Sequence, residues 1–427
     1  MFRTSFVNKS CDNGWLLRYG RMQSSFAVRI ARMHILSLQP YYGGSHQAFQ
    51  AGWLLNSEHE WTVLSLPPRH WKWRMRHAAV HFAKLIRDDF SDIRFDALFC
   101  SDFLNLAEFK GLVPPSVARL PAVVYFHENQ FAYPSRRHDE RDLHFGFTNF
   151  TSCLAADQVW FNSAFNRDSF FEGVRAACKK WPDFPPNDSL DSILPKCRIE
   201  PPGIAVEQFF AKRRRCNKSD GRQQAESVTE SKPVSIVWAA RWEHDKNPQL
   251  LLDSLRELKK RDLDFRISVV GESFRRVPEA FELIRSEFDS QIDRWGFQSA
   301  EDYRCLLKQS DVFISTADHE FFGISAAEAI IAGAFPVLPN RLAYPELIGA
   351  SKGKEREKLF LYDGSPSQLA EKIEYFTHLR DADKGHEYEL HRRVQEELAD
   401  QLNWSVRAAT MDHQIQSVCD DRALRTS

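Results

Sequence analysis

One stretch near residue 320 constrains the fold of this chain more than any other. A short, apolar, β-branched run at 311–316 is typical of a strand buried on both faces of a sheet. A loop running into an apolar helix follows at 318–333, and a second apolar run stands at 334–339. The order strand, loop, helix, strand indicates a parallel α/β unit. In such units the helix N-termini at the carboxyl ends of the strands form anion sites.

Two carboxylates stand in this stretch where charge is unusual. Seven residues separate Glu320 from Glu328, and all of them except Ser325 are small or apolar. If a helix begins near Gly323, its first turn offers free N–H groups to a phosphate, and Glu328 can reach hydroxyls beside it. The alternative is that Glu320 caps a loop and Glu328 is a solvated helix residue. The apolar flanks and Gly323 favour the ligand site.

The same alternation of short apolar strands with helices recurs along the 427 residues, which are enough for two full cores. It predicts the α/β class, with two doubly wound, Rossmann-like domains facing across a cleft. We expect a leader at 1–32 that is disordered or precedes the true start, a first domain at 33–211 and a flexible linker at 212–232. A second domain at 233–403 and a helix with a tail at 404–427 that crosses back complete the expected chain.

Composition narrows the function classes. The formal net charge is −1, so a polyanionic partner must be held by a local patch rather than by the whole surface. No apolar run has the length of about 18 residues that a membrane helix needs. The eight cysteines show no paired spacing and are typical of free thiols in a reducing compartment, which predicts a cytoplasmic protein without membrane contact.

Two candidate positions follow strands of the first domain. Gly43 and Gly44 form a turn after the strand at 34–38, where paired glycines allow positive φ and close approach to a ligand. His127 follows the strand at 122–126, at an edge where ligands bind, and an imidazole there suits hydrogen bonding to a sugar or acceptor hydroxyl. A buried core histidine is the alternative, which the polar run after His127 weakens.

A segment at 67–77 mixes aromatic and cationic side chains. It contains Arg69, Trp71, Lys72, Trp73 and Arg74. Such residues can stack on unpaired bases and hold phosphates. Equally, the tryptophans can pack inward at a helix start while the cations are solvated. Composition alone does not decide between these two interpretations.

Two cations mark the first loop of the second domain. Arg241 and Lys246 follow the strand at 234–239, and Gly271 follows the next strand, where we expect it to lie near a nucleotide. A diphosphate bound at such strand ends needs fixed positive charge if it is to leave in a reaction without collecting a proton. Arg241 and Lys246 are therefore the candidate groups for that charge.

The combination of motifs resembles one known family. Glu320 and Glu328 match the Glu-x7-Glu motif of retaining nucleotide-sugar glycosyltransferases of the GT-B architecture. The wider set of motifs is similar to that of the tRNA-queuosine α-mannosyltransferases, over residue 33 to the last helix. These motifs are Tyr-Tyr-Gly-Gly-Ser-His at 41–46, Leu-Pro-Pro-Arg-His-Trp-Lys-Trp-Arg at 66–74, Ser-Asp-Phe-Leu-Asn-Leu-Ala-Glu at 101–108, Tyr-Phe-His-Glu-Asn-Gln at 125–130, Arg-Trp-Glu-His-Asp-Lys at 241–246 and His-Glu-Phe-Phe-Gly at 319–323.

The resemblance implies transfer of mannose from GDP-mannose to queuosine at the wobble position of tRNA(Asp). It makes 33–211 the acceptor-side domain and 233–403 the nucleotide-sugar donor domain. It also implies RNA stacking by Trp71 and Trp73 and binding of the donor diphosphate by Arg241 and Lys246. Sugar and ribose contacts are implied for Glu320 and Glu328. The residues expected around the donor are completed by the glycines of both domains and by Phe322, Gly323 and Ile324 at the helix start.

The expected mechanism retains the sugar configuration and needs no metal, because no Asp-x-Asp motif stands at a strand end. Arg241, Lys246 and the helix dipole near Gly323 would stabilise the leaving diphosphate. The donor phosphate itself would take the acceptor proton while His127 orients the sugar or the incoming hydroxyl. Rival hypotheses are a lipid or polysaccharide acceptor, an inactive protein that binds nucleotide sugar or RNA, and a GT-B epimerase.

Overall fold

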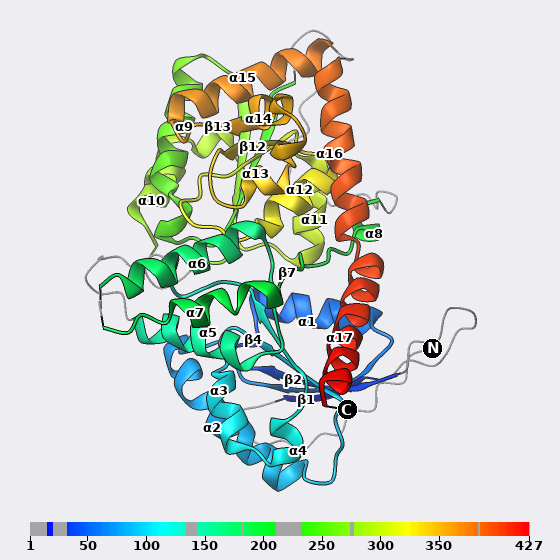
Figure 1. Ribbon diagram of the computed structural model, residues 1–427. Coiled ribbons are helices and arrows are strands. Elements are labelled where there is room, and N and C mark those ends of the chain that lie inside the picture. Colours follow the sequence, from blue (N-terminus) through cyan, green and yellow to red (C-terminus); the bar gives the residue numbers. More distant parts are fainter. Residues whose placement is uncertain are drawn as a thin grey trace. The chain divides into compact units, whose positions relative to one another are not determined.

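The computed structural model describes residues 15–19, 32–133, 143–180, 183–210, 232–273, 277–382 and 385–426. The chain divides into two compact units, residues 1–203 with 402–427 and residues 204–401. In each unit, helices lie on both faces of a mainly parallel sheet (Figure 1). Both units therefore have the doubly wound α/β fold that the sequence predicts.

The first unit contains a seven-stranded sheet in the order β1-β3-β2-β4-β5-β6-β7. Its strands from β2 to β7 pair in parallel, and β1 pairs antiparallel with β3 at the edge. Continuous apolar runs form the central strands because both of their faces are covered. The strands are β1 (Trp15–Tyr19), β2 (His34–Gln39), β3 (Glu60–Ser65), β4 (Ala97–Ser101), β5 (Ala122–Phe126), β6 (Gln158–Phe161) and β7 (Cys197–Ile199).

Helices of the first unit enclose an aromatic core. Trp53, Trp61 and Trp160 are fully buried in it. The last helix of the chain packs on the first helix of this unit (Figure 1). The helices are α1 (Gly44–Asn56), α2 (Trp71–Asp89), α3 (Leu106–Leu112), α4 (Pro115–Ala118), α5 (Leu143–Ala155), α6 (Ala164–Cys178), α7 (Asn187–Asp191) and α17 (Trp404–Thr426).

The second unit contains a six-stranded parallel sheet in the order β10-β9-β8-β11-β12-β13. Its strands are β8 (Val234–Ala239), β9 (Phe265–Val270), β10 (Ile292–Gly296), β11 (Val312–Ile314), β12 (Phe335–Pro339) and β13 (Leu361–Tyr362). Its helices are α8 (Glu207–Phe210), α9 (Pro248–Lys260), α10 (Glu279–Glu287), α11 (Ala300–Gln309), α12 (Ile324–Ala332), α13 (Tyr344–Leu347), α14 (Lys354–Phe360), α15 (Pro366–Ala382) and α16 (His386–Leu402).

The structure differs from expectation in the leader and at one cysteine. Within the leader expected at 1–32, residues Trp15–Tyr19 form β1, because the free edge of β3 accepts a further strand. The linker expected at 212–232 lies outside the described residues apart from Lys232. Cys305 is disulfide-bonded, against the expectation of free thiols throughout. Spacing in a sequence does not reveal which cysteines a fold brings together. The other cysteines described, Cys100, Cys153, Cys178, Cys197 and Cys419, are free thiols.

In the described parts of the chain, no helix combines the length and apolar character needed to span a membrane.

Candidate functional site

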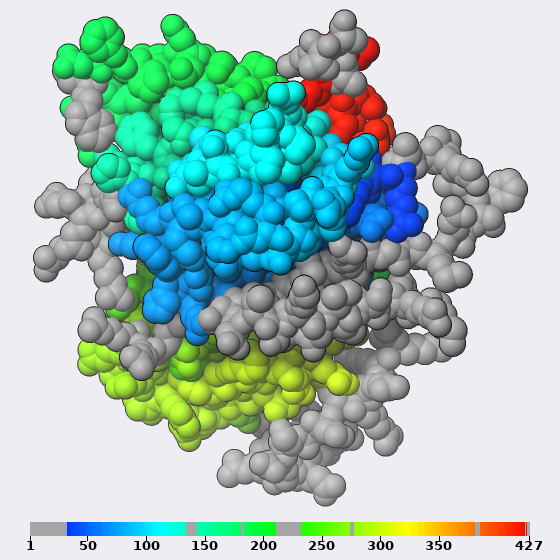
Figure 2. All heavy atoms as spheres, turned by 90° about the horizontal axis from the view of Figure 1, so that it is seen from below, coloured from blue at the N-terminus to red at the C-terminus, as the bar shows by residue number. Residues whose placement is uncertain are grey.

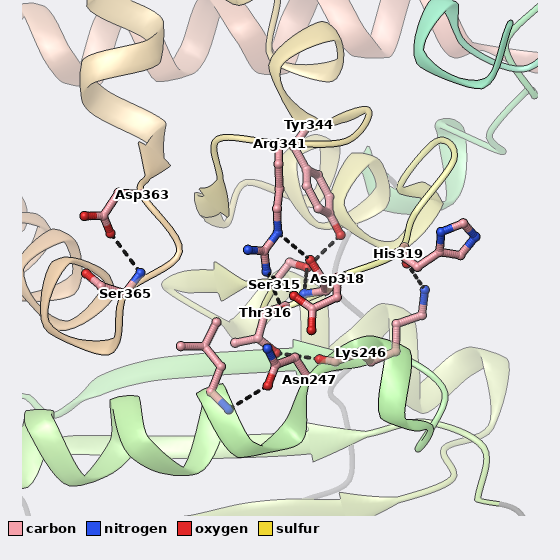
Figure 3. A network of polar contacts seen from close by, with 12 residues as sticks. Lys246, Asn247, Ser315, Thr316, Asp318, His319, Arg341, Tyr344, Asp363 and Ser365 are labelled. Carbon is pink, nitrogen blue, oxygen red and sulfur yellow. Dashed lines mark hydrogen bonds and ion pairs between the residues drawn. The ribbon is translucent and has the colours of Figure 1, made fainter. Parts of the chain in front are cut away.

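A buried lysine marks the strand ends of the second unit. Lys246 closes the short 3-10 turn η3 (His244–Lys246) after β8, and only 7% of its surface is exposed. Its Nζ donates to the backbone oxygen of His319 at 2.6 Å and to Oε2 of Glu320 at 3.3 Å. Nζ also lies 3.3 Å from Oδ2 of Asp245. The lysine therefore joins the loop after β8 to the loop before α12 (Figure 3).

Glu320 is held as a carboxylate in this arrangement. Burial opposes its ionisation, but the Lys246 ammonium and the N–H of Phe322 outweigh that effect and lower the pKa of Glu320. The Phe322 N–H donates to Oε1 at 3.4 Å. Glu320 and Lys246 thus form a pre-arranged charge pair.

The helix after Glu320 begins where the sequence predicts. Gly323 is the residue before α12 and has a φ of 90°, a conformation that glycine adopts without strain. A Cβ on Gly323 would come within 3.1 Å of the Tyr344 ring. Ile324 is the first helical residue, and its neighbours expose the free N–H groups of the first turn.

Glu328 lies on α12 beside a tyrosine that sequence reasoning missed. The hydroxyl of Tyr303, on α11, donates to Oε2 of Glu328 at 3.1 Å. Burial raises the pKa of Glu328 to about 7, and the Tyr303 hydrogen bond and the charge of Arg304 only partly oppose it. No sequence motif links Tyr303 to Glu328, because the two helices meet only in the folded unit.

Two further residues expected at the nucleotide-sugar site, Arg241 and Gly271, lie near the end of β8. Arg241 is exposed, and its Nη1 lies 2.9 Å from Oε2 of Glu243. Gly271 directly follows β9 with a φ of 151°, and a Cβ there would stand 1.8 Å from the backbone oxygen of Ala240. Gly271 therefore allows the β9 loop to contact the backbone just before Arg241.

A polar network supports the loop before α12. Arg341 donates through Nε to the Ala317 oxygen at 3.1 Å and through Nη2 to Oδ1 of Asp318 at 2.7 Å. The Thr316 hydroxyl donates to the Lys246 backbone oxygen at 2.7 Å (Figure 3). These bonds fix the backbone on both sides of the charge pair. Arg341 follows β12, where the sequence shows a polar residue at a strand end but no pattern for its role.

In the first unit, His127 lies where β5 ends and its main chain is held from both neighbouring strands. Its N–H donates to Oδ1 of Asp102 at 3.2 Å, and its oxygen accepts from Nδ2 of Asn162 at 2.8 Å. The ring lies 3.9 Å from that of His46, between centroids. Burial, and then the neighbouring His46, lower the pKa of His127 well below its usual value. His127 is therefore a neutral imidazole at physiological pH.

The two glycines of the first unit have different roles. Gly44 starts α1 with a φ of 53°. Gly43 is extended, and a Cβ there would stand 2.4 Å from the Pro68 side chain. The turn leads to His46 in the first turn of α1, and so to the ring of His127. Gly43 is thus explained by packing against Pro68 rather than by left-handed backbone.

Some side chains of the segment at 67–77 pack inward and others are exposed, so neither of the two interpretations of this segment describes all of them. Trp71 is half-buried, with its ring 5.1 Å from Phe145, and belongs to a small apolar cluster. Arg74 is buried and donates through Nε to the Pro67 oxygen at 3.2 Å, so its side chain packs inward, whereas the second interpretation has it solvated. Trp73 is 60% exposed. Lys72 and Arg69 are also exposed, and the Lys72 Nζ lies 5.6 Å above the Trp71 ring.

Comparisons with known proteins agree with this fold. The family model described as tRNA-queuosine alpha-mannosyltransferase N-terminal matches residues 34–204, and that of glycosyl transferases group 1 matches residues 220–396. The chain also resembles a sucrose-phosphate synthase from Thermosynechococcus elongatus, with a TM-score of 0.64 and 13% identity over 91% of this chain and 99% of the other.

Two relatives are named for mannosyltransferase activities. A tRNA-queuosine alpha-mannosyltransferase from Drosophila melanogaster is 42% identical over 318 residues, which cover 74% of this chain and 82% of the relative. A GDP-mannose:cellobiosyl-diphosphopolyprenol alpha-mannosyltransferase from Xanthomonas oryzae pv. oryzae is 29% identical over 115 residues, 25% of this chain and 28% of that one.

The two doubly wound units and the matching transferase model define a glycosyltransferase of the GT-B class. Within that class, the extent of the identity to the Drosophila protein and the match over the first unit decide the assignment. The chain belongs to the family of the tRNA-queuosine alpha-mannosyltransferases.

Proposed function

We propose that this enzyme transfers mannose from GDP-mannose, with retention of configuration, to queuosine at the wobble position of tRNA(Asp). The family supports mannose and queuosine, since the Drosophila relative is named for that reaction. The name of the Xanthomonas relative supports GDP-mannose as donor. The donor binds the second unit, and the acceptor binds the first.

The observation that carries the proposal is the buried Lys246 ammonium. It is fixed between the His319 oxygen and Glu320 at the strand ends, so its charge is in place before the reaction. As the bond from sugar to phosphate breaks, negative charge develops on the diphosphate. Lys246, Arg241 and the N–H groups at the start of α12 stabilise that charge without collecting a proton.

The two glutamates have separate roles in the donor complex. Glu320 is an ionised carboxylate that accepts hydrogen bonds from hydroxyls of the donor sugar. Glu328 accepts from the ribose hydroxyls, and the Tyr303 hydroxyl fixes the direction of its second oxygen. Phe322, Gly323 and Ile324 place the backbone of the helix start against the donor, and Gly271 leaves room beside the Arg241 loop.

On the acceptor side, the neutral His127 orients the donor sugar or the incoming hydroxyl. The donor phosphate takes the proton of the acceptor hydroxyl as the new bond forms on the face that the leaving group vacates. Because protein cations supply the positive charge, we propose that the transfer needs no metal ion. Treatment with EDTA should leave the initial rate unchanged, and a loss that Mg²⁺ restores would contradict this part.

A donor panel tests the proposed function. Purified protein is given queuosine-containing tRNA with GDP-mannose, GDP-fucose or UDP-glucose, and release of the nucleotide is followed. We expect turnover with GDP-mannose alone. Lys246→Ala should lower the rate by about 100-fold, on the scale of losing one transition-state charge contact. Lys260→Ala removes an equally charged but exposed side chain of the neighbouring α9 and should change little.

A further variant separates catalysis from folding. Lys246→Ala leaves Asp245 and Glu320 without their buried counter-charge and can unfold the unit, whereas Arg241 is exposed and can be removed safely. Arg241→Ala should therefore fold normally and still lose donor turnover. Equal turnover of UDP-glucose and GDP-mannose, or full activity of both variants, would contradict the proposal.

A further inference from the structure

The exposed face of α2 carries two neighbouring rows of side chains. One row has the rings of Trp73, His77 and His81, and the other has the cations Lys72, Arg76 and Lys84. Residues four or eight apart lie on one side of a helix, with about 6 Å along its axis for each step of four. We call these two rows the α2 platform. The blue to light-blue atoms of this part of the first unit form much of the face nearest the viewer in Figure 2.

Trp73 is a rigid part of this platform although it is exposed. Its ring stacks on that of His77 with 4.9 Å between centroids and 4° between planes. His77 is held at both nitrogens. Nδ1 lies 2.8 Å from the Trp73 oxygen and Nε2 lies 3.3 Å from the Arg74 guanidinium. A carbonyl requires Nδ1 to donate, and the guanidinium requires Nε2 to accept, so one neutral tautomer satisfies both.

This arrangement explains the buried Arg74. Its Nε is bound to the Pro67 oxygen at the start of α2, and its Nη1 fixes His77 from below. The chain therefore uses two side chains, those of Arg74 and His77, to present one flat indole to solvent. A tryptophan that only covered the core would be buried, as Trp71 largely is.

The charges beside the indole select the partner. Lys72 and Arg76 flank Trp73, and among the described residues no carboxylate forms an ion pair with either. Lys72 lies over the Trp71 ring, and Arg76 lies 4.9 Å from the Phe145 ring centroid. Between Trp71 and Arg87 the helix contains no acidic residue. A partner with flat aromatic groups and a negative backbone complements both rows.

We propose that the α2 platform binds unpaired nucleotides of the RNA acceptor, with a base stacked on Trp73 and phosphates held by Lys72 and Arg76. This inference rests on the proposed function for the identity of the RNA. A membrane surface is the other partner that cationic helices with tryptophan bind, but it requires a continuous apolar face. On α2 that face is buried in the core, and the exposed apolar side chains of the helix are Trp73 and Val80.

The test measures tRNA binding by fluorescence anisotropy with the full chain and no donor present. Stacking on one base predicts that Trp73→Ala weakens binding by about tenfold or more, and that Trp73→Phe recovers most of the loss. Val80→Ala is the matched control, since Val80 is 52% exposed on the same helix but has no stacked partner. It should bind as the parent does.

Salt dependence tests the cation row. Replacing Lys72 and Arg76 together by alanine should make the slope of log Kd against log salt shallower by about 1.4, because each phosphate contact of a single strand contributes about 0.7. The Lys84→Ala variant is a useful comparison, since Lys84 is already paired with Asp88. Its slope should change less than that of the double variant.

Several results would overturn the inference. One is tRNA binding by Trp73→Ala that equals that of the parent, and another is an equal loss of tRNA binding in Trp73→Ala and Val80→Ala. A third is a Trp73→Ala variant that loses binding to phosphatidylserine vesicles but keeps its binding to tRNA. The outcome is separable from the proposed function. If tRNA binding depends on Trp73 but no mannose is transferred, the platform stands and the transferase proposal falls. If Trp73→Ala transfers mannose with an unchanged kcat/KM, the platform falls and the transferase proposal stands.

Discussion

At the scale of single residues, Glu328 links function to stability. Its folded pKa of about 7 lies above the usual carboxyl value, so ionisation is disfavoured in the folded protein. The stability that its neutral form contributes is complete below the unfolded pKa of about 4.3 and is lost as the pH rises through 7. Glu328→Gln should therefore raise the free energy of unfolding at pH 8 by about 1–3 kcal/mol, with a much smaller gain at pH 5.

Urea unfolding at the two pH values measures this effect, and Glu282→Gln, on an exposed position of α10, is the control. A gain in the free energy of unfolding of Glu328→Gln over the parent that is no larger at pH 8 than at pH 5 would contradict the buried-carboxylate account.

Glu328→Gln should also lose affinity for the donor, because ribose hydroxyls bind the ionised carboxylate best. In the parent protein, GDP-mannose binding should weaken as the pH falls below 7, by up to about tenfold per pH unit.

Residue types and spacing predicted part of the candidate site. Lys246 and Glu320 stand at strand ends in the sequence, and the structure joins them directly. Tyr303 could not be predicted, since its bond to Glu328 depends on how two helices pack. Trp71 and Trp73 also look alike in the sequence, and only burial separates them. Local pattern places a residue at a strand end, but tertiary packing decides what its side chain contacts.

At the scale of elements, the apolar runs and glycines predicted the strands and helix starts well. The unit around α12 begins and ends as the sequence indicates, at Gly323 and Gly333. The sequence did not reveal β1, because a strand at a sheet edge depends on a neighbour with a free side rather than on its own apolar pattern.

Glycine at the end of β9 should be indispensable to that element. Gly271→Ala places a Cβ 1.8 Å from the Ala240 oxygen at a φ of 151°, and both the clash and the strain oppose folding. We expect a loss of at least about 2 kcal/mol, or insoluble protein. Gly111→Ala on α3 is the control, since nothing lies within 4 Å of its Cβ position, and it should be neutral or slightly stabilising. Equal thermal melts of the two variants would show the β9 contact to be unimportant.

At the scale of the whole molecule, the chain returns to its first unit through α17. Trp404 fills the space over Gly52 and Gly203. Asp412 accepts from Trp53 Nε1 at 2.8 Å and from the Glu58 N–H at 2.8 Å. These partners are more than 350 residues away in the sequence. The amphipathic pattern predicts the helix, whereas these particular contacts have no signal in the sequence.

Asp412→Ala should therefore destabilise the first unit. It leaves the buried donors of Trp53 and Ser57 and the Glu58 N–H without their acceptor, which costs about 2–4 kcal/mol in total. Asp420→Ala removes an exposed carboxylate on the same helix, which accepts from Gln416, and should cost less than about 0.5 kcal/mol. Hydrogen exchange should show the loss of protection in α1 and α17. If the two variants unfold alike, Asp412 does not hold the helix.

The central claim is mannosyl transfer to queuosine, and nucleoside mass analysis tests it most directly. The protein is incubated with GDP-mannose and either queuosine-containing tRNA or the same tRNA with guanosine at the wobble position, and the nucleosides are then released. We predict a hexose on queuosine of tRNA(Asp) that α-mannosidase removes, with no product from the guanosine tRNA or from Lys246→Ala. GDP release without any hexose on queuosine would contradict the account and assign the mannose to a lipid or glycan acceptor.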